Sequence, residues 1–313
     1  MSMDFEKPLV ELEEKMAELV KLNENEDVKF DTEIAELEKK MKSISKKTYS
    51  KLTPWQTVQV ARHSQRPLIR DYITGMCSEF IELHGDRCFG DDQGIIGGFA
   101  KIDDVRVMLI GHQKGKTVEE NIKSNFGMAN PEGYRKALRL MKLAEKYRIP
   151  VLSLIDTPGA YPGLEAEARG QAEAIARNLM EMATLETPIV VVITGEGGSG
   201  GAIGIGVGDV VLMLSNSVYS VISPEGCASI LWRDGSKAPV AADALKLTAE
   251  SLLELGVIDE IIKEPSGGAH RSYSEALPAV KETILRHLEK LSKVSGRKLT
   301  ERRFDKYAKI GRF

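Results

Sequence analysis

The chain has 313 residues, 42% of them hydrophobic and 28% charged, and a formal net charge of −3. This balance argues against a nucleic-acid-binding protein, which usually carries a basic excess clustered on one face. The three cysteines, Cys77, Cys88 and Cys227, form no C-x-x-C pair, so the chain by itself supplies neither a zinc ribbon nor a disulfide framework.

The N-terminal segment, residues 1–50, predicts a helical hairpin. Its polar stretch Asn23–Asp31 predicts the turn. The acidic, amphipathic start resembles neither a secretory signal nor a transit peptide, and no run of eighteen apolar residues occurs, so we expect a cytoplasmic protein without a membrane span. Apolar residues at steps of three and four mark two helices that pack along a seam: Leu9, Leu12, Met16 and Leu19, then Ile34, Leu37, Met41 and Ile44.

Residues 51–313 predict one α/β domain. Residues 50–104 are expected to hold a helix near Asp71–Leu83 and a short strand pair around Gly97–Arg106. Beyond them, continuous apolar runs alternate with amphipathic stretches at Tyr134–Ala144 and Ala168–Met182, which indicates βαβ units and a mostly parallel sheet buried on both faces. The expected strands are Val105–Ile110, Ile149–Ile155, Ile189–Ile193, Val210–Leu214 and Val218–Ile222.

Three loops follow strands of this sheet, where ligands bind in such folds: Gly111–Lys116, Asp156–Gly163 and Gly195–Gly201. The first resembles a phosphate loop, and the second begins like the D-x-x-G motif of GTPases. A phosphate loop needs four residues between its first glycine and the Gly-Lys pair, but only three intervene here. No N-K-x-D segment follows, so nucleotide binding is disfavoured.

The segment Gly197–Gly201 also fits the G-x-S-x-G motif of hydrolases, with Ser199 as the nucleophile, His270 as the base and Asp209 or Asp259 as the acid. A nucleophile elbow needs only two small neighbours, whereas this segment is glycine almost throughout. Such backbone exposure favours the amides themselves as functional groups. Biotin attachment at Lys142 is disfavoured too, because that lysine is expected in mid-helix, not at a β-turn.

Glycine-rich turns that lead directly into helices predict a site made of backbone amides. The N–H groups of a first helical turn are free to bind an anion, and a pair of them stabilises a developing oxyanion. The turn at Gly195–Gly201 has this form, and Tyr161-Pro162-Gly163 repeats it one βαβ unit earlier. The alternative is that these glycines only let helix and strand pack closely.

A specific resemblance supports the first interpretation. The sequence resembles the carboxyltransferase alpha subunits of bacterial acetyl-CoA carboxylases over most of its length, with weaker similarity before residue 50. The matching segments occur in the family's order and are long: Glu82–Arg87, Ile110–Lys116, Asn125–Lys146, Ile155–Gly163, Arg169–Leu179, Gly195–Asp209, Tyr219–Trp232 and Pro265–His270.

The resemblance implies a crotonase (ClpP-like) fold of repeated ββα and βαβ units, preceded by the helical hairpin. It implies transfer of a carboxyl group from carboxybiotin, held on the biotin carboxyl carrier protein, to acetyl-CoA, which yields malonyl-CoA for fatty-acid biosynthesis. The implied partner is a carboxyltransferase beta subunit with a zinc ribbon, in an α2β2 heterotetramer. Biotin carboxylase belongs to the wider complex, and no metal is expected in this chain.

Within that family the alpha subunit shapes the biotin side of the site. We expect the amides of Gly200 and Gly201 to form one oxyanion pair, with Gly163 and Leu164 lining the opposite wall. The coenzyme A thioester is expected on the beta side. The remaining residues predicted to line the biotin-side pocket are Gly159, Tyr161, Gly197, Gly198 and Ser199.

Several readings stay open. A non-catalytic scaffold, a decarboxylase and a propionyl-specific carboxyltransferase are the competing functions. His112 and Lys114 either border the site or have a structural role. Ser223 is expected as a helix N-cap before Pro224, and Trp232 as a core or interface residue. Three cations on one predicted helix either meet coenzyme A phosphates or form a solvated face: Arg135, Lys136 and Arg139.

Overall fold

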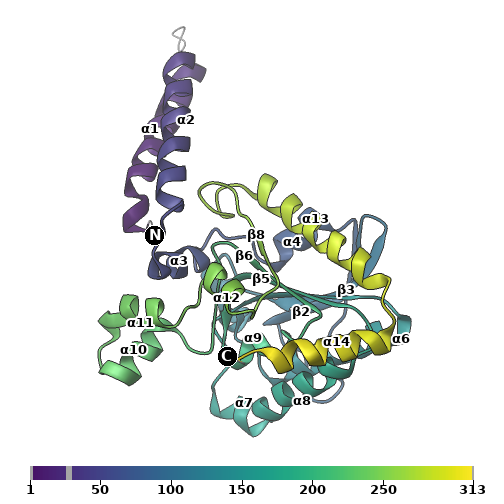
Figure 1. Cartoon of the computed structure of the whole chain (residues 1–313). Helices are drawn as coiled ribbons and strands as arrows, with labels where there is room; N and C mark the ends of the chain where they lie inside the picture. Colours follow the sequence, from purple (N-terminus) through teal and green to yellow (C-terminus); the bar gives the residue numbers. More distant parts are fainter. Residues whose placement is uncertain (1–2, 26–29, 312–313) are drawn as a thin grey trace.

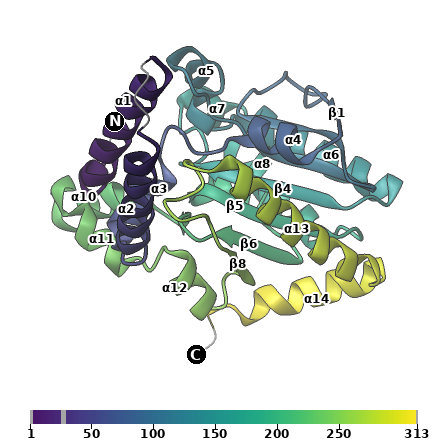
Figure 2. The ribbon, with the colours of Figure 1, turned by 90° about the horizontal axis from the view of Figure 1, so that it is seen from above.

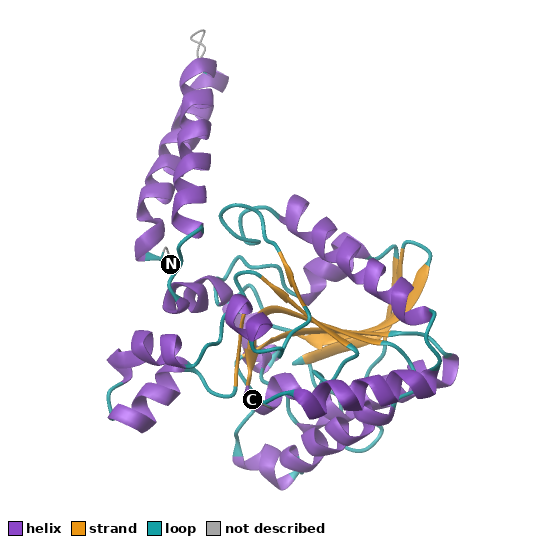
Figure 3. Cartoon of the chain, viewed as in Figure 1, coloured by secondary structure: helices purple, strands orange, loops and turns teal. Residues whose placement is uncertain are grey.

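The computed structural model describes residues 3–25 and 30–311 and has an eight-stranded sheet at its centre. Helices cover both faces of the sheet (Figures 1 and 3). The first three strands pair antiparallel and the others parallel, in the order β1-β2-β3-β4-β5-β6-β8, with β7 beside β5. The strands are β1 Glu79–Glu82, β2 Ile95–Ile102, β3 Val105–His112, β4 Val151–Thr157, β5 Ile189–Gly198, β6 Val210–Leu214, β7 Val218–Ser220 and β8 Glu260–Ile262.

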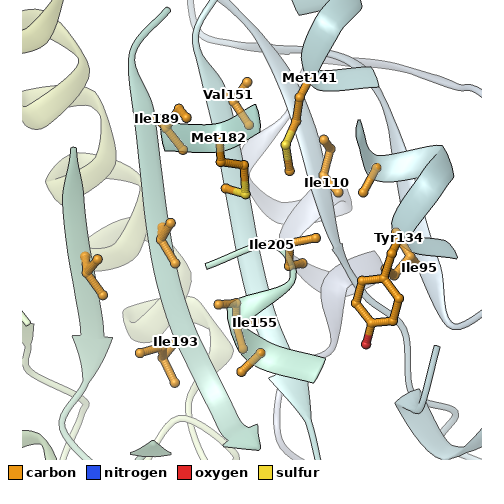
Figure 4. Close-up of a cluster of buried hydrophobic side chains, with 14 of the residues drawn as sticks. Ile95, Ile110, Tyr134, Met141, Val151, Ile155, Met182, Ile189, Ile193 and Ile205 are labelled. Carbon is orange, nitrogen blue, oxygen red and sulfur yellow. The ribbon is translucent and has the colours of Figure 1, made fainter. Parts of the chain in front are cut away.

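The apolar runs are strands because both faces of the sheet are buried. Helices α6 (Pro131–Tyr147) and α8 (Gln171–Thr184) cover one face, and α4 (Ile69–Met76) and α13 (Tyr273–Ser292) cover the other. Side chains of the central strands therefore alternate between two apolar clusters. Figure 4 shows the first cluster, in which Met141 and Met182 from the helices contact the strands.

The other helices connect these layers or extend from them. Helix α14 contacts α8, and α10 and α11 pack on each other beside α3, away from the sheet (Figure 1). None of the helices in the described part of the chain has the length and apolar character needed to cross a bilayer. The α-helices are α3 Pro54–Ala61, α5 Val118–Lys123, α7 Leu164–Ala168, α9 Ser199–Ile203, α10 Pro224–Trp232, α11 Ala238–Ala244, α12 Ala249–Glu254 and α14 Gly296–Lys309, with 3-10 turns at Asp4–Glu6, Asn125–Gly127 and Gly235–Lys237.

The predicted hairpin is present as α1 (Lys7–Asn25) and α2 (Asp31–Tyr49), which stand out from the sheet domain (Figures 1 and 2). Leu9 and Leu12 are buried at its base, and the other seam residues are partly buried. The predicted turn at Asn23–Asp31 lies partly outside the described residues. Two helices alone bury little surface, so tertiary contacts at the base must supply much of the hairpin's stability.

Three predicted elements are wrong in detail. The helix expected over Asp71–Leu83 ends at Met76, and Glu79–Glu82 is instead strand β1, because it pairs with β2 far along the chain. The helix expected over Ala168–Met182 is broken at Gly170, whose φ of 82° ends α7 before α8 begins. The last expected strand stops at Ser220. The strand pair around Gly97–Arg106 and the mostly parallel α/β sheet are confirmed.

Candidate functional site

Two glycine-rich turns lie side by side at one edge of the sheet. Strands β4 and β5 are parallel neighbours, and Thr157 at the end of β4 pairs in register with Gly197 near the end of β5. The chain then runs through Pro158–Gly163 into α7, and from Gly198 directly into α9. The sequence prediction that both turns share one edge is therefore confirmed.

Glycine is required where the two turns meet. A Cβ on Gly201 would lie 2.4 Å from the Gly159 carbonyl carbon and 2.6 Å from Ala160 N. A Cβ on Gly198 would lie 2.1 Å from the Pro158 carbonyl oxygen. Close packing, the alternative interpretation, thus accounts for Gly198 and Gly201. It does not account for Gly200, where a Cβ would meet only the Ile175 side chain, at 3.5 Å.

The start of α9 is exposed and conformationally unusual. Ser199, its first residue, has a φ of 49°, a left-handed conformation that non-glycine residues rarely adopt and that concentrates at functional sites. Gly198 precedes it and provides no side-chain cap. The N–H groups of the first turn of helix α9, which include those of Gly200 and Gly201, therefore lack the usual side-chain acceptor.

In the glycine-rich loop after β4, some backbone amides donate hydrogen bonds and others do not. Gly159 N–H donates to Thr157 Oγ1 at 3.1 Å, and Tyr161 N–H donates to the Ala129 carbonyl at 3.1 Å. Within the described part of the chain, the N–H groups of Ala160 and Gly163 donate no hydrogen bond. Sequence reasoning missed Ala160, since nothing in the order of residues distinguishes its amide from those beside it.

Leu164 opens α7 on the same loop. Its side chain is 81% exposed, which is unusual for leucine and leaves an apolar group next to the turn. A Cβ on the preceding Gly163 would lie 2.3 Å from the ring of Tyr161, so that ring packs against the backbone. These residues form an open wall facing solvent on the side of α7.

A polar layer lies beneath the two turns. Lys114 Nζ is 2.6 Å from Asp156 Oδ1, and the same carboxylate oxygen accepts the Glu196 N–H at 3.0 Å. A Cβ on Gly195 would lie 2.5 Å from this oxygen, so glycine leaves the room that the carboxylate occupies. Asp156 thus joins the loop after β3 to the ends of β4 and β5.

His112, the last residue of β3, belongs to the same layer. It is buried, and neither ring nitrogen has a hydrogen-bond partner among the residues that the structure describes. Burial lowers the pKa of His112 to about 3, Asp156 and the backbone of Gly201 act to raise it, and Lys114 lowers it further. The His112 ring and the Gly201 backbone lie near each other but do not meet the geometry of a hydrogen bond. A neutral imidazole therefore lies under the second turn.

The three cations of α6 do not form a solvated face, so that part of the sequence interpretation is wrong. Arg135 Nε is 2.8 Å from Asp86 Oδ2, and Arg139 Nε donates to the Gly85 carbonyl at 3.0 Å. Lys136 is buried and lies 2.5 Å from Asp91 Oδ1. All three hold the loop at residues 83–92 in place.

The competing motifs do not assemble. His270 contacts Glu6 and Tyr49 at the base of the hairpin, and Ser199 takes part in none of its contacts. Lys116 pairs with Asp71 at 2.6 Å, a use unlike that of a phosphate-loop lysine. Lys142 lies within α6 and pairs with Glu181 at 2.7 Å, as a helix-surface lysine would.

Glu6, His63 and His270 bring a carboxylate and two imidazoles within 4.8 Å of one another. The Arg271 guanidinium already pairs with Glu6 at 3.0 Å, and the two imidazole rings contact each other with centroids 4.2 Å apart and planes tilted by 33°. Burial raises the pKa of Glu6, but hydrogen bonds from His270, Tyr49 and Arg271 outweigh it and lower the pKa to about 2. The cluster is better explained as a polar contact that joins the hairpin to the domain than as a metal site.

Ser223 caps α10 as predicted: its Oγ accepts the Gly226 N–H at 3.1 Å, and Pro224 is the first helical residue. Trp232 ends the same helix and is 38% exposed, so it is not a core residue. It belongs to a group of exposed apolar side chains on and around α10 and α11: Val221, Ile230, Leu231, Trp232 and Val240.

The model of one protein family, described as acetyl co-enzyme A carboxylase carboxyltransferase-like, matches residues 2–311. The chain belongs to this family. The carboxyltransferase alpha subunit of the acetyl-CoA carboxylase of Geobacter metallireducens is 57% identical over 99% of this chain and 98% of its own length. That of Methylococcus capsulatus is 54% identical over 99% and 96%. The family predicted from the sequence motifs, an enzyme family of carboxyl transferases, is confirmed.

Solved structures of a transcarboxylase and of a malonate decarboxylase share the fold. Transcarboxylase 12S superimposes with a TM-score of 0.60 at 17% identity, over 75% of this chain, which spans only 44% of that protein. A chain of a Pseudomonas malonate decarboxylase hetero-tetramer gives a TM-score of 0.60 at 14% identity, over 76% of this chain and 94% of its own. The predicted crotonase-like fold class is confirmed.

Proposed function

We propose that this chain is the alpha subunit of an acetyl-CoA carboxylase carboxyltransferase and that its two amide turns form the biotin side of the active site. The reaction would move a carboxyl group from carboxybiotin, on the biotin carboxyl carrier protein, to acetyl-CoA and give malonyl-CoA. Family membership supports the reaction. The observation that carries the site is the contact between two glycine turns at adjacent strand ends.

The space at the turns suits a flat polar group lying against the backbone. A Cβ on Gly159 would meet no atom within 4 Å, and one on Gly200 would meet only the end of Ile175. The pocket proposed here comprises these turns, with Tyr161, Gly197, Gly198 and Ser199 around them. Carboxybiotin, when bound, supplies the activated carboxyl group.

The chain's own task is to hold negative charge on an oxygen while the carboxyl group moves. The N–H groups of Gly200 and Gly201 would donate to that oxygen, with Gly163 and Leu164 lining the opposite wall and Ala160 as a further donor. Donors fixed before the reaction stabilise the transition state more than the ground state, and removing one such donor costs about 10²–10³ in rate. Close contact between the turns brings these groups together.

We also propose the partners that the family implies: a zinc-ribbon beta subunit that binds the coenzyme A thioester, in an α2β2 complex, with the carrier protein and biotin carboxylase beyond it. The exposed apolar side chains around α10 and α11 support a partner on that surface, since large apolar patches usually mark interfaces. A malonate decarboxylase of similar fold is itself a hetero-tetramer.

The domain division proposed is a hairpin unit at residues 1–50 and a carboxyltransferase domain at residues 51–313, in the cytoplasm. Helices α1 and α2 pack on each other. Their contacts with the domain lie at the base, where Glu6 and Glu13 pair with Arg271 and Ser45 Oγ lies 3.2 Å from Ser266 Oγ.

The test is reconstitution with a candidate beta subunit. The two chains should co-purify in equal amounts, and the complex should carboxylate free biotin at the expense of malonyl-CoA, the reverse of the proposed reaction. A variant Trp232→Glu tests the apolar surface, because a buried charge there should prevent assembly. Phe304, 71% exposed on α14, is the matched control: Phe304→Glu adds the same charge at an exposed aromatic residue of another helix.

A verified complex that leaves free biotin unmodified would overturn the proposal. Release of acetyl-CoA and CO₂ from malonyl-CoA without biotin would instead identify a decarboxylase. Loss of assembly in both the Trp232 and the Phe304 variants would mean that an added charge at either site prevents assembly, and the proposal of a partner surface at α10 and α11 would be contradicted.

A further inference from the structure

The ion pair of Lys114 and Asp156 occupies an unusual place for a charged pair. Its side chains are only 18% and 8% exposed, and it adjoins the ends of β4 and β5, from which the two amide turns begin. Lys114 comes from the loop after β3, and Asp156 is the second-last residue of β4. A pair this sheltered is screened little by solvent, and its removal leaves an uncompensated charge.

The carboxylate of Asp156 contacts the backbone on both sides of the site. Its own chain continues through Thr157 and Pro158 into the first turn, while its Oδ1 accepts the N–H of Glu196, two residues before Gly198. The room for the carboxylate exists because Gly195 lacks a side chain. One oxygen atom thus joins the strand ends from which both turns begin.

Residues 196–198 are also held by pairing with β7 and by the Arg62–Glu196 ion pair, but the helix that follows them has little support of its own. Helix α9 has five residues, no side-chain N-cap, and a first residue with positive φ. Such a short segment is set by what lies beneath it, because it cannot be held by its own helical hydrogen bonds. The polar layer beneath it contains Lys114, Asp156 and the neutral imidazole of His112.

From these contacts we infer that Lys114 and Asp156 are positioning residues: their ion pair holds the two amide turns at the separation that transfer requires. The inference rests on the proposed function for its catalytic consequence. Neither side chain reacts or needs to touch the substrate. A shift of about 1 Å between the turns is enough to cost roughly 100-fold in rate, because donors act only at the correct distance.

The experiment compares Lys114→Met, Lys114→Arg and the double variant Lys114→Met/Asp156→Asn in the reconstituted complex. We expect Lys114→Met to lower kcat roughly 10- to 100-fold with KM for malonyl-CoA within about twofold, and Lys114→Arg to restore most of the loss. The double variant carries no unpaired charge, so it should fold normally yet keep the low kcat. Lys142→Met, which breaks the partly exposed Lys142–Glu181 pair, is the matched control.

Hydrogen exchange on the isolated chain gives a readout independent of activity. In the double variant, peptides covering residues 158–164 and 196–204 should both exchange faster than in wild type, while peptides from α13 stay unchanged. Unchanged exchange in either turn would overturn the inference, as would a kcat that falls only in proportion to the folded fraction. If wild-type complex shows no transfer at all, the proposed function fails, but the exchange result still tests the coupling of the turns.

Discussion

The buried imidazole of His112 predicts a measurable dependence of stability on pH. In the folded chain its pKa is about 3, mainly because of burial, whereas an unfolded chain has the ordinary value of 6.5. Between these values the unfolded state binds a proton that the folded state does not. The free energy of unfolding must therefore fall as the pH is lowered through 6.5, and the loss continues toward pH 3.

The magnitude follows from the two pKa values. At pH 5 the unfolded ring is almost fully protonated while the folded ring stays neutral, so going from pH 7 to pH 5 costs about 2 kcal/mol of stability through this residue. Carboxylates with lowered pKa, such as Glu6 and Asp91, both at about 2, lose their contributions mostly below this range. Between pH 7 and pH 5, the change in the free energy of unfolding therefore comes mainly from the histidines.

The perturbation is His112→Phe, which keeps a flat ring and removes the titratable group. Urea unfolding of wild type and variant at pH 7 and pH 5 gives four free energies. The drop between the two pH values should be about 2 kcal/mol smaller in the variant. His63, whose pKa burial lowers to about 4, is present in both proteins and cancels. His84→Phe removes an exposed imidazole and is the control for the general effect of replacing a histidine on the unfolding free energy.

Equal drops in wild type and His112→Phe would refute the reasoning, since the ring would then titrate alike in both states. Nitrogen-15 spectra of the histidine rings provide a second measurement. The His112 signals should keep the pattern of a single neutral tautomer from pH 8 to pH 5. A titration midpoint near 6.5 would mean that water reaches the ring freely.

Two further predictions concern packing. Gly201→Ala should lower stability by about 1–3 kcal/mol, because its methyl group would overlap Gly159. Gly200→Ala should leave stability unchanged, because the space there is open. Thermal unfolding of the two variants measures the difference. Arg66→Met should cost roughly 3–5 kcal/mol, since Arg66 and Glu264 pair at 2.6 Å with both side chains 1% exposed. Recovery of much of that loss in Arg66→Met/Glu264→Gln, measured by urea unfolding, would support an unpaired charge as the cause, and no recovery would contradict it.

Much of the sheet was predictable because burial on both faces leaves a local signature. The run Ile189–Ile193 has no polar residue, and only a central strand accommodates that. Strand β1 has no such signature: Phe80 and Ile81 fit a helix equally well, and their state is decided by pairing with residues 99 and 100. Local periodicity cannot report a partner that lies about twenty residues away.

For the proposed site, the sequence predicted the backbone turns but not the side chains that support them. Glycine spacing located both turns, since glycine has few other reasons to recur so densely before a helix. The layer beneath them was not visible, because Lys114 and Asp156 are 42 positions apart and each resembles an ordinary loop or strand-end residue. The cations of α6 were misread for the same reason: Lys136 and its partner Asp91 are separated by 45 positions.

A site built from amides needs rigid support from outside itself. Glycine exposes the backbone but loses more conformational freedom on folding than any other residue, so glycine turns alone would not hold donors in place. Side-chain amides of α8 add to the ion pair below: Gln171 Nε2 donates to the Tyr161 carbonyl at 2.9 Å, and Asn178 Nδ2 donates to the Gly204 carbonyl at 2.8 Å. Each turn is thus tied to α8 from one side and to Asp156 from below. In the proposed function the catalytic groups are main-chain atoms, and these side chains hold them in position.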